Sequence, residues 1–303
     1  MNVLRRFADS DIGYSFLKSR MTLCAVLVVA VIIIGAVCAD ILAPHRPFDP
    51  ATLELMDALT PPVWSDNGRW TYPLGTDDQG RDVLSTIMFG ARISLIVGLA
   101  SVLLSMAIGV GLGLLSGYAG GTLDSLIMRV AEVQLTFPAI LIALLIDGVA
   151  RTALPRDVHA DVAIIVLVCA IGLSNWVQYA RTVRSSTMVE KGKEYVQAAR
   201  VMGVHPAMIM IRHILPNVVG PVLVIATIGL ALAVVTEATL SFLGVGVPPT
   251  QPSLGTLIRI GNDFLFSGEW WIAVFPSIVL VAIVLAVNLI GDWLRDVLNP
   301  KLR

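Results

Sequence analysis

The chain has 303 residues, of which 56% are hydrophobic and only 14% are charged, and its formal net charge is −1. Soluble domains carry about 25% charged residues, so this composition indicates an integral membrane protein rather than a soluble domain. The near-neutral charge gives no sign of a nucleic-acid partner. Cys24, Cys38 and Cys169 lie in apolar runs without metal-ligand spacing, which predicts small buried side chains rather than disulfides or a zinc site.

A membrane-spanning helix needs about 20 largely apolar residues. Five uncharged segments meet this requirement, at residues 21–39, 93–115, 162–180, 218–236 and 270–290. The first of them is too long for the hydrophobic region of a signal peptide, and no cleavage site follows it, so no cleaved leader is expected. A sixth span is predicted at 125–146 even though Arg129 and Glu132 lie in its first turns and Pro138 in its middle, because neighbouring helices can satisfy a carbonyl that proline frees.

Six spans place both termini on the same side of the membrane. With the N-terminus inside, 14 of the 21 Lys and Arg residues fall in cytoplasmic segments and 7 in external ones, so this orientation is favoured. The predicted organisation follows the chain: a cytoplasmic segment at 1–20, a first transmembrane helix at 21–42, an external loop at 43–92, a transmembrane core at 93–293 with a cytoplasmic loop at 181–217, and a cytoplasmic tail at 294–303.

Small residues recur every fourth position in the second span, at Ser105, Gly109, Gly113 and Gly117. This spacing places them on one helix face and lets another backbone approach closely, which predicts tight packing inside the bundle.

The acidic segment before the second span, residues 76–82, has no histidine near it in the sequence and is predicted to form a structural elbow that caps the following helix. A short external or re-entrant helix is predicted at 254–266. The four histidines are scattered over different loops, so no metal-ligand pair is expected.

The loop between the fourth and fifth spans reads "KEYVQAARVMGVHPAMIMIRHILPN" from Lys193 to Asn217. Its first residues favour helix, Gly203 suits a C-terminal stop, and Pro206 suits the first turn of a second short helix. Pro216 is expected to limit that second helix. Ala198 and Ala199 are expected to present a flat surface, beside a small apolar knob of Val201 and Met202. The pattern therefore predicts a loop that protrudes from the membrane and is bound by a partner. The alternative is a helix that lies along the bilayer surface.

The stretches "QAARVMG" and "HILPN" resemble the EAA loop of ATP-binding cassette importer permeases. In that family the loop forms a coupling helix that docks into a groove of the ATPase subunit. Two residues depart from the pattern: Gln197 stands where the family has Glu, and His213 takes an apolar position. Gln197 cannot make the charged pair that a Glu at this position could make.

Three further segments resemble signatures of the C-type subunit of dipeptide, oligopeptide and nickel permeases. They are "LGTDDQGRDVLSTIMFGARISL" (74–95), "LSFLGVGVPPTQPSLG" (240–255) and "NLIGDWLRDVLNPKLR" (288–303). Leu254 stands where the family usually has Trp. The resemblance covers residues 74–303, most of the chain.

The resemblance implies an all-α, polytopic membrane protein with about six transmembrane helices, a cytoplasmic coupling helix pair and the type I importer permease architecture. The implied location is the bacterial cytoplasmic membrane. The implied partners are a homologous permease subunit, two cytoplasmic ATP-binding subunits or domains and an extracytoplasmic substrate-binding protein. The chain has no G-x-x-x-x-G-K-[ST] motif, so no cofactor is expected in it, and ATP and magnesium belong to the partner ATPase.

The candidate coupling residues are therefore Glu194, Gln197, Ala198, Ala199, Arg200, Val201, Met202, Gly203, Val204 and His205. Glu237 and Phe137 are candidates for the translocation path. An acid inside a membrane span is costly and often functional, although Glu237 is equally explained by hydrogen bonds within the bundle. No catalytic residue is expected.

Two other classes of protein compete with this interpretation. An ion-driven secondary transporter should show broken helices in symmetry-related repeats with polar residues at mid-membrane, and no convincing repeat is found. A membrane-embedded enzyme would need paired acids or a histidine cluster at the bilayer, and neither is present. The substrate stays open among peptides, glutathione, nickel chelates and opines.

Overall fold

The computed structural model describes residues 11–49, 53–153, 155, 159–248 and 250–298. This part of the chain is helical and has no strands, as predicted; its only β-type pairing is an isolated bridge between Thr76 and Asp82. The predicted terminal segments 1–20 and 294–303 lie partly outside the described residues. The α-helices are α2 (Asp11–Lys18), α3 (Arg20–Val37), α4 (Ala39–Leu42), α5 (Val83–Ala119), α6 (Gly121–Leu135), α7 (Ala139–Ala153), α8 (His159–Lys191), α9 (Glu194–Val201), α10 (Pro206–Met208), α11 (Leu215–Phe242), α12 (Leu254–Phe264) and α13 (Trp271–Leu298).

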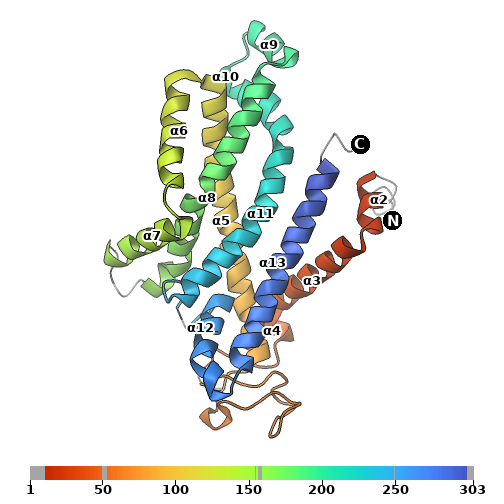
Figure 1. Cartoon of the computed structure of the whole chain (residues 1–303), viewed down its shortest axis with the longest axis vertical. Coiled ribbons are helices and arrows are strands. Elements are labelled where there is room, and N and C mark those ends of the chain that lie inside the picture. Colours follow the sequence, from red (N-terminus) through yellow and green to blue (C-terminus); the bar gives the residue numbers. More distant parts are fainter. Residues whose placement is uncertain (1–10, 50–52, 154, 156–158, 249, 299–303) are drawn as a thin grey trace.

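Among the described residues, five long helical segments are apolar enough to cross a membrane, and they correspond to the five uncharged spans predicted from the sequence. Figure 1 shows α5, α8, α11 and α13 running along the molecule, with α3 inclined beside α13. The α9–α10 segment lies at one end of the molecule. The loop between α4 and α5 lies at the other end, near α12. The helix α12 begins at Leu254, as predicted, and continues into a 3₁₀ turn, Leu265–Ser267.

The sixth predicted span is not a single kinked helix. Helices α6 and α7 meet at an angle of 92° across a short break, so they form either one broken span or a re-entrant pair. Thr136 and Phe137 close the end of α6 with bonds of 3.2 Å to carbonyls three residues earlier. Pro138 has no N–H to continue the ladder and disfavours helical geometry at Phe137. The proline therefore separates two helices where the sequence predicted a tolerated kink.

The small-residue face of α5 packs on α8, as predicted. Ser105 Oγ donates a hydrogen bond of 2.8 Å to the Gly172 carbonyl. A Cβ atom added at Gly113 would lie 2.6 Å from the Ala180 carbonyl oxygen, and one at Gly117 would lie 2.7 Å from Thr187 Cβ. Only glycine allows the two backbones to approach this closely, so these positions set the spacing between the helices.

Helix α5 begins at Val83, ten residues before the predicted span, and Asp82 caps it by accepting a bond of 2.9 Å from Ser85 N. Arg92, the charged residue directly before the predicted span at 93–115, lies inside the helix. Its guanidinium donates to the Ala36 carbonyl at 2.7 Å and pairs with Asp40 at 2.8 Å, which ties the end of α3 to α5.

The elbow at residues 76–82 has a structural role, as predicted. Asp77 accepts bonds from the Arg81 backbone at 2.9 Å and from its Nε at 2.6 Å, and both side chains are buried. The indole of Trp271 donates to the Thr76 carbonyl at 3.0 Å, so the elbow is attached to the start of α13. In contrast to the sequence interpretation, a histidine does lie near these acids: His45 Nδ1 is 3.6 Å from Asp82 Oδ2.

Candidate functional site

The segment α9–α10 protrudes at one end of the molecule, beyond the ends of the long helices (Figure 1). Helix α9 ends at the predicted glycine corner. Gly203 has φ +75°, its N–H bonds to the Arg200 carbonyl, and the Val204 N–H bonds to the Ala199 carbonyl, both at 3.1 Å. These two bonds form a Schellman motif, which a residue with positive φ, usually glycine, completes. Pro206 then starts α10, as predicted.

One face of α9 is anchored in the hydrophobic core. Val196 and Ala199 are buried against Ile209 and Ile214 of the following segment. The prediction that Ala199 forms part of a flat outer surface is therefore wrong, because only 1% of Ala199 is exposed. Helical periodicity alone does not tell which of two adjacent alanines points inward, whereas the packing of α9 on the next helix does.

The opposite side of α9 and its C-terminal corner are exposed. Val201 is 88% exposed and Met202 is 74% exposed, so the predicted apolar knob projects from the fold. The other exposed candidates are Glu194, Gln197, Ala198, Arg200, Gly203 and His205. Val204 is half-buried. Large apolar side chains this exposed at the tip of a rigid corner are typical of an interaction surface.

A network of polar side chains joins α9 to the neighbouring helices. The Tyr195 hydroxyl donates to the carboxylate of Glu190, at the end of α8, at 2.6 Å, and Lys193 pairs with the same carboxylate at 2.6 Å. Asn217 of α11 donates to the Tyr195 oxygen at 3.2 Å and to the His213 carbonyl at 2.8 Å. Burial, the hydrogen bond to Glu190 and its negative charge raise the pKa of Tyr195 to about 12, so the hydroxyl stays protonated and donates at neutral pH.

Two further contacts connect α9 with α5 and α8. The guanidinium of Arg200 lies 5.6 Å from the centre of the Tyr118 ring, near the end of α5, within the range of a cation–π interaction. The side-chain amide of Gln197 donates to the Lys191 carbonyl at 3.0 Å. The amide that replaces the Glu of the family pattern is thus used inside the chain. A hollow of about 340 Å³ lies beside it, lined by residues that include Ser116, Asp124 and Gln197.

The connection from α10 to α11 differs from the prediction. Pro216 does not end the second short helix, because the chain stays helical from Pro206 to Phe242. A π-helical segment, Ile209–Ile214, lies before the proline, and the Leu215 N–H bonds to the Met210 carbonyl five residues earlier. Pro216 follows directly in the first turn of α11, where the missing N–H and the fixed φ of proline are tolerated. The α9–α10 segment is therefore joined to α11 without a hinge-like loop.

The two candidates for the translocation path lie in different surroundings. Glu237 is fully buried, and its two carboxylate oxygens accept hydrogen bonds of 2.7 Å from Ser94 of α5 and Ser241 of α11. Ser94 also accepts a bond of 3.2 Å from the first N–H of α12. Phe137 lies at the bend between α6 and α7 and is 58% exposed. The structure does not bring these two residues together with α9.

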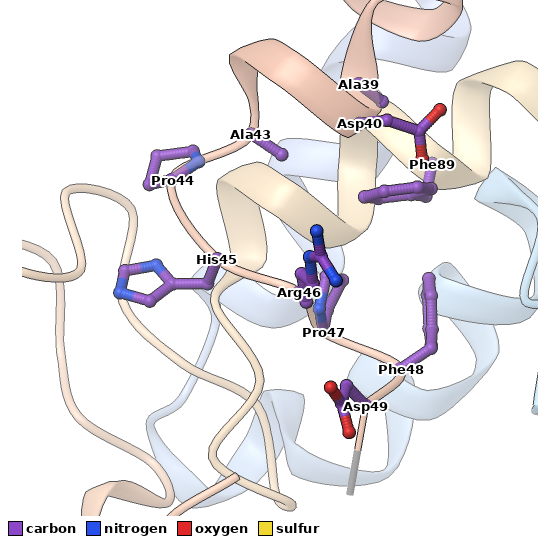
Figure 2. Close-up of a pocket in the computed structure, with 10 residues that line it drawn as sticks. All are labelled: Ala39, Asp40, Ala43, Pro44, His45, Arg46, Pro47, Phe48, Asp49 and Phe89. Atoms are coloured by element: carbon purple, nitrogen blue, oxygen red, sulfur yellow. The ribbon is translucent and has the colours of Figure 1, made fainter. Parts of the chain in front are cut away.

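A second hollow, which the sequence did not indicate, lies at the opposite end of the molecule, between α4 and the start of α5 (Figure 2). Its volume is about 520 Å³. The rings of Phe48 and Phe89 meet edge to face there, with centroids 5.7 Å apart. Figure 2 shows Arg46 beside these rings and the imidazole of His45 directed away from them.

Comparison with known proteins gives concordant matches. The family model "Binding-protein-dependent transport system inner membrane component" matches residues 109–303. The chain is 40% identical over 265 residues to the dipeptide transport system permease protein DppC of Haemophilus influenzae, covering 87% of this chain and 86% of the relative. It is 36% identical over 289 residues to the glutathione transport system permease protein GsiD of Pectobacterium atrosepticum, covering 95% and 89%.

A more distant relative is the oligopeptide transport system permease protein OppC of Bacillus subtilis, which is 33% identical over 293 residues, with coverage of 97% and 90%. Among solved structures, a chain of the MetNI methionine ABC transporter in an inward-facing conformation superposes with a TM-score of 0.56. The match covers 71% of this chain and 96% of that chain at 19% identity, which shows a shared fold.

Proposed function

The chain belongs to the family of inner membrane components of binding-protein-dependent transport systems, and from this premise we propose that it forms half of the path by which an importer moves short peptides into the cell. The resemblance to an ATP-binding cassette importer permease and the type I importer fold are both confirmed. The protein is a multi-pass membrane transport subunit and not an enzyme. Its family works with ATP-binding subunits and a substrate-binding protein.

The substrate class rests on the names of the relatives. Those described above are dipeptide, oligopeptide and glutathione permeases, whose cargo shares peptide bonds. Short peptides are therefore the proposed substrate. None of these relatives is named as an ion-driven transporter, so the alternative of ion-gradient coupling finds no support.

The observation that carries the coupling proposal is the attachment of α9. Its inner face is buried with Val196 and Ala199, while its exposed tip presents Val201 and Met202. Contacts from Tyr195, Gln197 and Arg200 tie the same short helix to the ends of α8 and α5. A force applied at the tip would therefore reach three long helices together, since α9 and α10 also lead directly into α11.

The proposed docking surface consists of the exposed candidates predicted from the sequence together with half-buried Val204. Ala199 supports this surface from the inside. The ATP and magnesium belong to the partner subunit. In this proposal Phe137, which is exposed at the α6–α7 bend, faces the translocation path. The assignment of Glu237 to the path stays a prediction, because its carboxylate is buried and accepts a hydrogen bond from Ser94.

The proposed second half of the path is a related permease subunit. The proposed orientation places α9 and both termini in the cytoplasm, in keeping with the distribution of Lys and Arg residues. It is supported by a contact between the two ends of the chain: the rings of Phe16 in α2 and Trp293 in α13 lie 5.3 Å apart, so both ends lie on one side of the bundle.

The experiment that tests the proposal is the double variant Val201→Asp with Met202→Asp. Because both side chains are exposed, the variant should insert and fold normally but lose co-purification of the ATP-binding subunits and peptide uptake. The matched control is Met56→Asp, which changes a 94%-exposed methionine in the loop between α4 and α5. If the double variant retains its ATP-binding subunits and transports as the control does, α9 is not the docking helix.

A further inference from the structure

The hollow between α4 and the start of α5 lies at the depth where the apolar part of the bundle ends. Helix α3 has 18 residues and is therefore about 27 Å long, close to the thickness of about 30 Å of a hydrocarbon core. Asp40 follows the end of α3, and Arg92 directly precedes the apolar run 93–115 of α5. These two side chains pair at 2.8 Å. Two separate segments thus place charges at one boundary of the bilayer, at the end of the molecule opposite to α9 (Figure 1).

An exposed apolar surface runs along α3 toward this hollow. Leu27, Val31 and Ile34 are each more than half exposed, and they lie on one face because they are three or four residues apart. Ile41 and Leu42 of α4 are also more than half exposed, and the hollow is lined by the residues on either side of them in the sequence. An apolar surface of this kind inside a bilayer suits acyl chains, and it ends beside the hollow.

The lining of the hollow combines charges of both signs with aromatic rings. Arg46 lies beside the two phenylalanine rings, and Asp40 and Asp49 lie on opposite sides of the hollow (Figure 2). Arg92, the partner of Asp40, has its guanidinium 5.1 Å from the centre of the Phe89 ring. The formal charges of the two acids and the two arginines sum to zero. Separated charges that balance in this way match a zwitterion better than they match an anion or a cation.

We propose that this hollow binds the headgroup of a phospholipid that carries a primary ammonium group, such as phosphatidylethanolamine, in the leaflet farther from α9. The lipid phosphate lies beside Arg46, whose guanidinium can donate two parallel hydrogen bonds to phosphate oxygens. The ammonium group lies beside Asp49 or Asp40 and donates its N–H groups to the carboxylate. The acyl chains follow the exposed face of α3. The volume of about 520 Å³ leaves room for the headgroup.

The headgroup chemistry sets the expected selectivity of the site. Phosphatidylglycerol has the phosphate but no ammonium group, so it leaves the carboxylates without a partner. A choline headgroup carries a positive charge but has no N–H to donate to a carboxylate. A lipid also fits better than a soluble zwitterion, because only a lipid uses the apolar surface of α3 together with the hollow. The inference goes beyond the proposed function and does not depend on which solute the importer carries.

The test is a cross-link without a spacer, made in the whole importer in nanodiscs of phosphatidylethanolamine and phosphatidylglycerol. A water-soluble carbodiimide activates a carboxylate, the lipid amine attacks the carboxyl carbon, and an amide forms as one carboxylate oxygen leaves with the urea. Peptide mass spectrometry locates the attached lipid. We expect it on Asp49 or Asp40, at a yield at least 10-fold above that on Asp66, an exposed acid of the same loop outside the hollow. An equal yield on Asp66, or no lipid on Asp49 and Asp40, would overturn the inference.

A pair of variants measures the contribution of the phosphate partner. Arg46→Gln should lower the yield of lipid on the two acids at least 5-fold. The matched control is Arg69→Gln, which changes an arginine with a 60%-exposed side chain in the same loop, outside the hollow, and should leave the yield unchanged. Equal yields for the two variants would also overturn the inference.

Two further outcomes identify other occupants. Water-soluble O-phosphoethanolamine, supplied to the importer in nanodiscs of phosphatidylglycerol alone at the same total amine concentration, should give at least 10-fold less adduct than the lipid. An equal adduct would show that the acyl chains contribute nothing and would overturn the assignment to a lipid. If a partner subunit or a binding protein covers the hollow instead, the two acids react with the lipid only after that partner is removed, and this result too would overturn the inference.

Discussion

Removal of the Tyr195 hydroxyl should loosen α9 while leaving its outer surface unchanged. The hydroxyl donates to the Glu190 carboxylate at 2.6 Å, and 8% of Glu190 is exposed. In Tyr195→Phe that carboxylate keeps the 2.6 Å contact with Lys193, and Asn217 keeps its bond to the His213 carbonyl. The variant loses the bond to Glu190, which as a hydrogen bond to a charged group contributes about 1.5–3 kcal/mol, and the 3.2 Å bond from Asn217, whose exposed amide can donate to water instead.

This loss can be measured as local opening of α9. Because each 1.4 kcal/mol changes an equilibrium tenfold, hydrogen exchange of the α9 amides should accelerate by about 10- to 150-fold. The matched control is Tyr72→Phe, which removes a hydroxyl that bonds to Asp57 at 3.0 Å in the loop between α4 and α5. The control should accelerate exchange in its own loop and leave α9 unchanged.

The assembled importer gives an independent readout of the same variant. If α9 transmits force through the Glu190–Tyr195–Asn217 network, an importer that carries Tyr195→Phe should continue to hydrolyse ATP, while the amount of peptide taken up per ATP falls. An exchange rate in α9 within twofold of the parent would refute the energetic argument. Accelerated exchange with unchanged uptake per ATP would refute the role of the network in coupling.

Two glycines give further predictions. Gly113→Ala should destabilise the bundle by about 1–3 kcal/mol through overpacking, because its Cβ would lie 2.6 Å from a backbone carbonyl oxygen of α8. Thermal unfolding in detergent measures this loss of stability. The control Gly111→Ala, whose Cβ would have no atom within 4 Å, should leave the unfolding temperature unchanged. Gly203→Ala has open space around it but places alanine at φ +75°, so α9 should lose about 1–2 kcal/mol of local stability by hydrogen exchange. Gly203→Asn should lose less, and equal losses for Ala and Asn would contradict a purely backbone origin.

Hydrophobic length and local turn chemistry are properties of short stretches of sequence, and they were sufficient to locate most of the fold. Uncharged runs of about 20 residues predicted five membrane-spanning helices. Gly203 predicted the corner after α9, because a Schellman motif favours glycine at that position. The four-residue spacing of small side chains on α5 likewise predicted a close helix contact, although not that α8 makes it.

The prolines show where local rules stopped being sufficient. Pro138 separates α6 from α7 by 92°, whereas Pro216 lies inside a continuous helix. The rule that proline removes a donor applies to both. The outcomes differ because Pro216 lies in the first turn of α11, directly after a π-helical segment that keeps the chain helical, whereas the chain at Pro138 breaks its helical ladder and turns.

The candidate site divides in the same way. Sequence pattern was enough to place α9 in an exposed loop and to mark Val201 and Met202 as its apolar tip. The burial of Ala199 and the bond between Tyr195 and Glu190 were decided by tertiary structure. Each of these features depends on which faces of two helices meet. The packing of the whole bundle determines those faces, and a short stretch of sequence does not contain that information.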